Sequence, residues 1–510
     1  MSRVKHTVRN AKVSLFFYLL ATVTGFITRK IFLDYLGDDF MGLTGTLKSI
    51  LGFLNLAELG IGTAISFMLY KPLFEKNHEE IKQLLYLIRF LYKRLGLIIL
   101  GAGLILSLFF PLIFQNQPMP MYVIYLGFYA YLLAAVFGFF VNSTQIILEA
   151  DQKVYVIAGY FQSFNIIRQI AQAGIAYYMQ SMVLWLCMEM IFSMVNSYYI
   201  NRQVNKTYPF LKVKIKSYKN IYKEYPLAIE KIKQVFVHKI SSFVTSGTDQ
   251  LLIYALVSLK SVAFFGNYLM IFSQINVLVN NLFAGMAAGV GNLVAENDHA
   301  RIHKVFWEMM GVRVFLAGII LINLYFLVDP FITIWLGDKY ILDRLIIYVM
   351  LFNLGMKIIR LPIDNYITAY GLYQDTWAPI AQITINLTIS IIFGIKMGIA
   401  GIMLGTSISM FTIMFLWKPY FLYKNGFSQN VYKSFWPNFL KMILSLIISF
   451  VIIYWLVVEL FVIESRSFLT LTWSIIKINL LILPIISLIL YLFNQGFRDF
   501  VGRLIKMSKL

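Results

Sequence analysis

The chain has 510 residues, of which 59% are hydrophobic and 13% are charged, and its formal net charge at pH 7 is +20. Soluble proteins carry about 25% charged residues, so this composition excludes an ordinary soluble domain and indicates an integral membrane protein. The excess of Lys and Arg therefore indicates how the chain is oriented in the membrane and does not indicate nucleic-acid binding. The chain has a single cysteine, Cys187, which excludes an intrachain disulfide and a cysteine-rich metal site.

Apolar stretches that are long enough to cross a bilayer recur along the whole chain. A membrane-spanning helix needs about 20 apolar residues, and we expect an all-α polytopic membrane protein with fourteen such helices. In chain order they are expected at 13–36, 42–70, 88–114, 121–148, 154–178, 181–200, 236–259, 262–293, 309–335, 343–371, 376–397, 398–420, 438–462 and 471–494. The first stretch is too long for a signal-peptide core, so we expect it to be retained as a helix.

The connecting segments set the expected orientation. With the N-terminus in the cytoplasm, 32 of the 44 Lys and Arg residues lie at or near the inner face, and ten of them fall within 202–239. The outward connections, such as "DYLGDD" and "LGDKYILD", are acidic or neutral. Because positive residues collect on the cytoplasmic side, we expect both termini in the cytoplasm and an even number of spans.

The two halves of the chain resemble each other. The second span starts at "FMGL", runs to "ELGIGTAIS" and ends in the polar "EKNHEEIKQLL". Near 224 residues later the chain has "FFGN", "AGMAAGVGN" and "AENDHARIHKVF" in the same order. We therefore expect two pseudosymmetric six-helix bundles, 1–201 and 236–420, joined by a basic cytoplasmic loop, 202–235. Two additional helices and a cytoplasmic tail occupy 421–510. Repeats of this kind are typical of secondary transporters, which bind substrate between the repeats.

Charged side chains inside the expected spans are the candidate functional residues. A charge near the bilayer centre costs about 2.5–3.5 kcal/mol on insertion scales, so each charge needs an ion pair, an interface or an aqueous cavity. The candidate cations are Arg29, Lys48, Arg168, Lys239, Lys357 and Arg360, and the interior acids are Glu58, Glu189, Asp249 and Asp364. Arg29 and Lys48 are expected at a similar depth on adjacent helices.

Two interpretations of these charges stay open. In the structural one, Lys239 extends its ammonium to the interface and Arg360 pairs with Asp364, four residues further along the helix. In the functional one, the cations line a water-filled cavity between the two halves. The interior cations outnumber the acids, so complete neutralisation is not expected. Such a cavity attracts an anion, and Arg suits phosphate because its planar group donates two parallel hydrogen bonds.

Three segments carry a resemblance to a known family: "FITRKIFLDYLGDDFMGL", "FLNLAELGIGTAISFMLYKPL" followed by "NHEEIKQLL", and "GIAGIMLGTSISM". With these segments the chain resembles the multidrug/oligosaccharidyl-lipid/polysaccharide exporter (MOP) superfamily, and within it the Wzx-type polysaccharide flippases of bacteria. The resemblance covers essentially the whole chain.

The resemblance implies a flippase of the bacterial inner membrane. Its substrate would be an undecaprenyl-pyrophosphate-linked oligosaccharide, moved from the cytoplasmic to the periplasmic leaflet by alternating access, for O-antigen or capsule synthesis. Related flippases bind pyrophosphate with cations on the first two helices, and Arg29 and Lys48 occupy matching positions. The six candidate cations would bind the pyrophosphate and acidic sugars, and a glycan polymerase and chain-length proteins are possible partners beside membrane lipid.

Energy for transport is expected from an ion gradient. The sequence has no G-x-x-x-x-G-K-[ST] loop to bind ATP, so no cofactor is expected beyond a coupling Na⁺ or H⁺. Carboxylates inside a membrane commonly serve as such ion sites, and the candidates are Asp249, Glu58 and Asp364.

Two alternatives remain. A cation-coupled drug antiporter of the same superfamily should have acids rather than cations dominating its cavity. A membrane glycan polymerase usually needs a sizeable external loop, whereas the outward connections here are short. We therefore expect a transporter and not an enzyme.

Overall fold

The computed structural model describes residues 3–55, 61–115, 117–151, 153–212, 240–241, 243–245, 247–283, 286–372, 374–461 and 467–507. Within these residues every regular element is helical, which confirms the all-α polytopic class. The helices form two compact units, Met1–Gly266 (unit 1) and Asn267–Leu510 (unit 2). The expected bundle boundaries, 1–201 and 236–420, remain a prediction.

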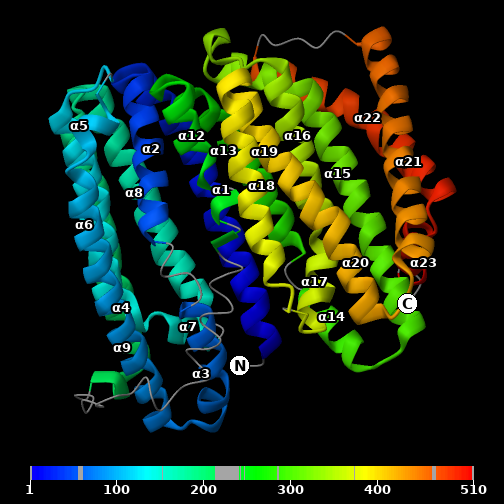
Figure 1. The fold of residues 1–510 in the computed structure, drawn as a ribbon, viewed down its shortest axis with the longest axis horizontal. Coiled ribbons are helices and arrows are strands. Elements are labelled where there is room, and N and C mark those ends of the chain that lie inside the picture. The colour runs from blue at the N-terminus through cyan, green and yellow to red at the C-terminus, as the bar shows by residue number, and fades with distance from the viewer. Residues whose placement is uncertain are drawn as a thin grey trace. The chain divides into compact units, whose positions relative to one another are not determined.

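Unit 1 is built around long helices that pack in pairs (blue to green in Figure 1). Helix α1 packs along α8, α6 packs against α9, and α2 contacts both α6 and α12. The bounds are α1 (Arg3–Leu36), α2 (Asp38–Leu54), α3 (Ile61–Glu75), α4 (His78–Ser107), α5 (Phe110–Ile113), α6 (Met121–Val141), α7 (Ile146–Ala150), α8 (Val154–Met179), α9 (Met182–Thr207), α12 (Asp249–Leu256) and α13 (Leu259–Leu282), which continues into unit 2.

Unit 2 is organised around α15, which contacts α16, α21, α22 and α23. The bounds are α14 (Met286–Ala295), α15 (His299–Trp335), α16 (Arg344–Ile359), α17 (Leu361–Ala369), α18 (Trp377–Met397), α19 (Ile399–Met410), α20 (Lys418–Leu422), α21 (Val431–Leu460), α22 (Phe468–Phe493) and α23 (Gln495–Met507). Two π-helical stretches, Phe411–Trp417 and Tyr423–Phe427, extend α19 and α20 into one span.

Polar caps fix where several of these helices begin. The Asp298 carboxylate accepts the backbone N–H of Arg301 at 3.1 Å, and Asn430 and Ser467 cap α21 and α22 in the same way. A side-chain acceptor at this position satisfies a backbone donor that the helix itself leaves unpaired. Helix α15 therefore begins at His299 rather than at the expected residue 309, and one more basic residue, Arg313, comes to lie well inside it.

Eleven helices in the described part of the chain are long and apolar enough to cross a membrane, whereas we expected fourteen. Three expected spans account for the difference. The span 42–70 is divided into α2 and α3, and residues 56–60 between them lie outside the described residues. The span 154–178 is the continuous helix α8, but Arg168 and several Asn and Gln residues lower its hydropathy. The span 236–259 is described only in part.

Candidate functional site

Unit 1 brings two of the six candidate cations, Arg29 and Arg168, within electrostatic range of a third, Lys48. Arg29 lies on α1, Lys48 on α2 and Arg168 on α8, and the Lys48 ammonium interacts electrostatically with both guanidinium groups. Glu189 on α9 is the acid that interacts with Lys48 in this group. We call these four residues the cation cluster; with three cations and one carboxylate its formal charge is +2.

Arg168 is held by a network of side chains from α8 and α9. Its Nη1 pairs with Glu189 Oε1, and its Nη2 donates to Asn165 Oδ1 at 2.5 Å. Gln172 Nε2 donates to the other carboxylate oxygen of Glu189 at 3.1 Å. The Glu189 side chain is only 8% exposed. Because both of its oxygens accept hydrogen bonds, this buried carboxylate is well compensated, and it fixes the direction of the Arg168 side chain.

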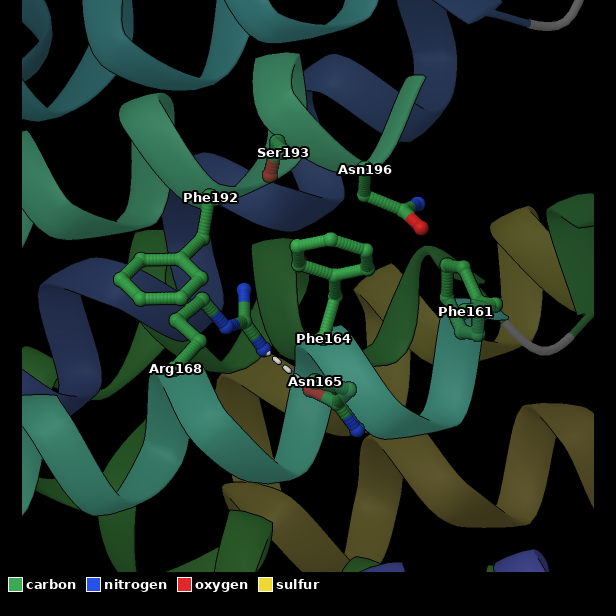
Figure 2. Close-up of a pocket in the computed structure, with 7 residues that line it drawn as sticks. All are labelled: Phe161, Phe164, Asn165, Arg168, Phe192, Ser193 and Asn196. Carbon is green, nitrogen blue, oxygen red and sulfur yellow. Dashed lines mark hydrogen bonds between the residues drawn. The ribbon is translucent and has the colours of Figure 1, made fainter. Parts of the chain in front are cut away.

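A small cavity of about 50 Å³ adjoins Arg168 (Figure 2). Phe161, Phe164 and Phe192 supply its aromatic lining, and Asn165, Ser193 and Asn196 supply polar groups. Among the described residues, Arg168 Nε and Asn196 Oδ1 are buried without a hydrogen-bond partner. A cavity needs about 10–15 Å³ to hold a water, so water fits here and can satisfy both atoms, while a sugar does not fit.

Lys48 and Arg29 have different surroundings. The Lys48 ammonium lies 5.3 Å from the centroid of the Tyr131 ring. Its side chain is exposed in the structure. Arg29 is half-buried, and its Nη2 donates to the carbonyl of Ala263, the fifth residue of α13, at 3.0 Å.

The remaining predicted residues do not join the cation cluster in the described structure. Lys239 and Glu58 lie outside the described residues. Asp249 is 7% exposed in the first turn of α12, where the helix dipole favours a carboxylate.

In unit 2, Arg360 Nε lies 3.2 Å from Asp364 Oδ2, which confirms the predicted pair. Lys357 is half-buried in the last turn of α16.

Two features were missed at the sequence level. Glu189 was recognised as an interior acid, but not as the partner of Arg168. Arg313 falls within the expected span 309–335 but was not included among the candidate cations, yet it is 2% exposed and its guanidinium carbon lies 4.0 Å from the centroid of the Phe283 ring. Within the part of the chain that the structure describes, Arg313 makes no hydrogen bond or ion pair. The signal that could have placed it is the helix-capping Asp298, followed by the continuous pattern "HARIHKVFWEMMGVR".

No family model and no curated protein matches the chain. Among solved structures, the chain is similar to the lipid II flippase MurJ in an inward closed conformation. The TM-score of this match is 0.66 and the sequence identity is 17%, and the aligned region covers 96% of this chain and 99% of the flippase chain. It is also similar to a multidrug resistance MATE family transporter of the MOP superfamily in an inward-facing conformation. That TM-score is 0.51 at 14% identity, covering 80% of this chain and 97% of that one. Identities this low establish the fold alone: a multi-pass helical membrane fold shared with these transporters.

Proposed function

We propose that the protein is a secondary-active flippase of the Wzx type. Its substrate would be an undecaprenyl-pyrophosphate-linked oligosaccharide, moved from the cytoplasmic to the periplasmic leaflet of the bacterial inner membrane for cell-surface polysaccharide synthesis. The observation that carries the proposal is the cation cluster, which α1, α2, α8 and α9 bring together in a fold shared with a lipid II flippase.

The charge of the cation cluster matches this substrate. A pyrophosphate diester carries two negative charges, and the cluster has a formal charge of +2. Arg29 and Lys48 would meet the pyrophosphate first. Arg168 would then exchange Glu189 for a phosphate oxygen, since a guanidinium donates to phosphate in the same paired geometry as to a carboxylate. The polyprenyl tail would stay in lipid.

The internal repeat of the sequence suggests how the substrate would be moved across the membrane. Fourteen spans arranged as two six-helix bundles and two further helices, with both termini in the cytoplasm, would alternate access to the site. Lys239, Lys357 and Arg360 would bind acidic sugars. Asp249 is the favoured site for a coupling Na⁺ or H⁺ because it is buried. A glycan polymerase and chain-length proteins would use the product.

A cation-coupled drug antiporter is the second candidate, because the chain also shares its fold with a MATE transporter. The net positive charge of the cation cluster disfavours a cationic drug as substrate. A membrane glycan polymerase finds no support, since the similar structures are transporters.

Reconstitution tests the proposal. Liposomes would contain the protein and undecaprenyl pyrophosphate linked to a fluorescent oligosaccharide, and a membrane-impermeant quencher would report the label that reaches the outer leaflet. We expect Arg29→Gln and Lys48→Gln each to slow flipping roughly 10- to 100-fold, since a hydrogen bond to a charged group contributes about 1.5–3 kcal/mol. The control is Lys93→Gln, because Lys93 is an exposed residue of α4 outside the cluster. Wild-type rates in both cluster variants would refute the assignment.

A further inference from the structure

Unit 2 contains a second cationic site, separate from the cation cluster. A cavity of about 480 Å³ opens between α15, α21 and α23, and we call it the α23 pocket. Its lining includes Lys304 from α15, Lys441 from α21 and Arg498 from α23. Three basic side chains from three helices thus border one cavity that is large enough for a phosphorylated headgroup.

The basic groups of the α23 pocket are only partly neutralised. Asp499 is the one acid in its lining, and its carboxylate lies 3.8 Å from Lys304 Nζ. Arg498 donates to the carbonyls of Tyr491 and Leu492 at 3.2 and 3.1 Å, which orients the guanidinium without removing its charge. Lys441 makes no ion pair with any residue that the structure describes. The pocket therefore keeps a formal charge of +2 for an anion.

One wall of the pocket is fixed by a hydrogen-bond network around His303. Trp307 Nε1 lies 3.3 Å from His303 Nε2, and the Ser434 and Tyr423 hydroxyl oxygens lie 3.1 and 3.3 Å from the same nitrogen. An indole N–H can only donate, so His303 Nε2 accepts and Nδ1 carries the proton of the neutral ring. The side chains of this wall are therefore held in place by hydrogen bonds.

The start of α23 is docked closely on α15. A Cβ on Gly496 would overlap the carbonyl of Trp307, and one on Gly311 would lie 2.8 Å from the backbone nitrogen of Phe497. Arg503 and Glu308 add an ion pair of 2.5 Å between the same helices. Because this contact is backbone to backbone, Arg498 is presented to the pocket from a rigid position.

The α23 pocket also lies at the ends of two candidate membrane spans. Helix α15 begins at His299 and α22 ends at Phe493, so these two spans end at the pocket. Helix α23 is amphipathic and carries basic residues beside the exposed side chains Leu504 and Ile505, as expected of a helix lying in the membrane interface. Basic pockets between membrane helices at this level are suited to anionic headgroups.

We propose that the α23 pocket binds a phosphate ester, with Lys441 and Arg498 as its principal ligands. A phospholipid headgroup is the source favoured by the exposed apolar residues of α23, and a soluble phosphate ester is the other source of the same chemistry. The site is separate from the proposed transport site and does not depend on the proposed function.

Native mass spectrometry of the purified full-length protein tests this proposal. Four probes would be titrated: phosphatidylglycerol, the zwitterionic phosphatidylcholine, diacylglycerol and soluble glycerol phosphate. We expect the tightest phosphatidylglycerol binding event to weaken at least tenfold in Lys441→Gln/Arg498→Gln and to be unchanged in Lys506→Gln, a matched exposed residue of α23 outside the pocket lining. Retention by the charge-conserving Lys441→Arg, with an unchanged melting temperature, would separate ligand loss from misfolding.

Each outcome of this titration either supports the phosphate site or overturns it. Preference for phosphatidylglycerol over the other probes assigns the pocket to a lipid. Tight binding of glycerol phosphate that is lost in the double variant supports the phosphate site with a soluble source. Equal binding of diacylglycerol and phosphatidylglycerol, or phosphatidylglycerol binding that survives in the double variant, would overturn the proposal.

Discussion

The charged residues inside the expected spans have different surroundings. Arg168 is paired and hydrogen-bonded, Lys48 is exposed and lies beside the Tyr131 ring, and Arg29 donates to a backbone carbonyl. Arg313 is stacked on an aromatic ring and fully buried. Arg360 is paired with Asp364 on the same helix face.

The Arg168–Glu189 pair gives a prediction about stability. Glu189→Gln removes the carboxylate and leaves Arg168 in a mostly buried site, so we expect a loss of roughly 3 kcal/mol in the free energy of unfolding, as for other broken buried pairs. Thermal denaturation in detergent should show a lower midpoint. The double variant Arg168→Met/Glu189→Met should recover most of the loss, because it removes both charges together. A single variant as stable as the wild type would show that the pair is not a structural element.

At the scale of the helices, close approach depends on small residues. In "GIAGIMLGTSISM", Gly401 and Gly405 are four residues apart and face α18: a Cβ on Gly405 would lie 2.7 Å from the carbonyl oxygen of Asn386, and one on Gly401 would overlap the carbonyl of Phe393. Small residues at this spacing let two membrane helices pack closely. The segment that carries the family resemblance therefore has a definite packing role in this chain.

Gly405→Ala should consequently push α18 and α19 apart. We expect a loss of about 1–3 kcal/mol, the usual cost of overpacking, seen as a lower melting temperature in detergent. Gly101→Ala on α4 is the control, since nothing lies within 4 Å of a Cβ at that position. A melting temperature that falls equally in both variants would contradict the close packing of α18 on α19.

The elements also show what the sequence could and could not predict. The length of the apolar stretches predicted the positions of α6, α18, α21 and α22 well, because each of them is one continuous apolar helix. It gave no reason to divide 42–70 into α2 and α3, since both parts are apolar. The similar depth of Arg29 and Lys48 was obtained by counting residues along the sequence, and it stays a prediction. The pairing of Arg168 with Glu189 could not be found in this way, because it depends on how α8 and α9 are rotated about their axes.

At the scale of the whole molecule, the distribution of basic residues predicts that both termini lie in the cytoplasm. The chain has one cysteine, so Cys187→Ser gives a cysteine-free background for labelling. In that background we expect Ser2→Cys and Ser508→Cys to react with a membrane-impermeant maleimide only after the cells are permeabilised. Labelling of just one of the two in intact cells would mean an odd number of spans.

The central claim is that the cation cluster recognises pyrophosphate, and binding tests it more directly than transport does. The affinity of the purified protein for undecaprenyl pyrophosphate would be compared with that for uncharged undecaprenol, in the wild type and in Arg29→Gln/Lys48→Gln. We expect the wild type to prefer the pyrophosphate roughly 100-fold, since two hydrogen bonds to charged groups contribute about 3 kcal/mol or more, and we expect the double variant to lose this preference. Equal affinity of the wild type for the two lipids would contradict the account.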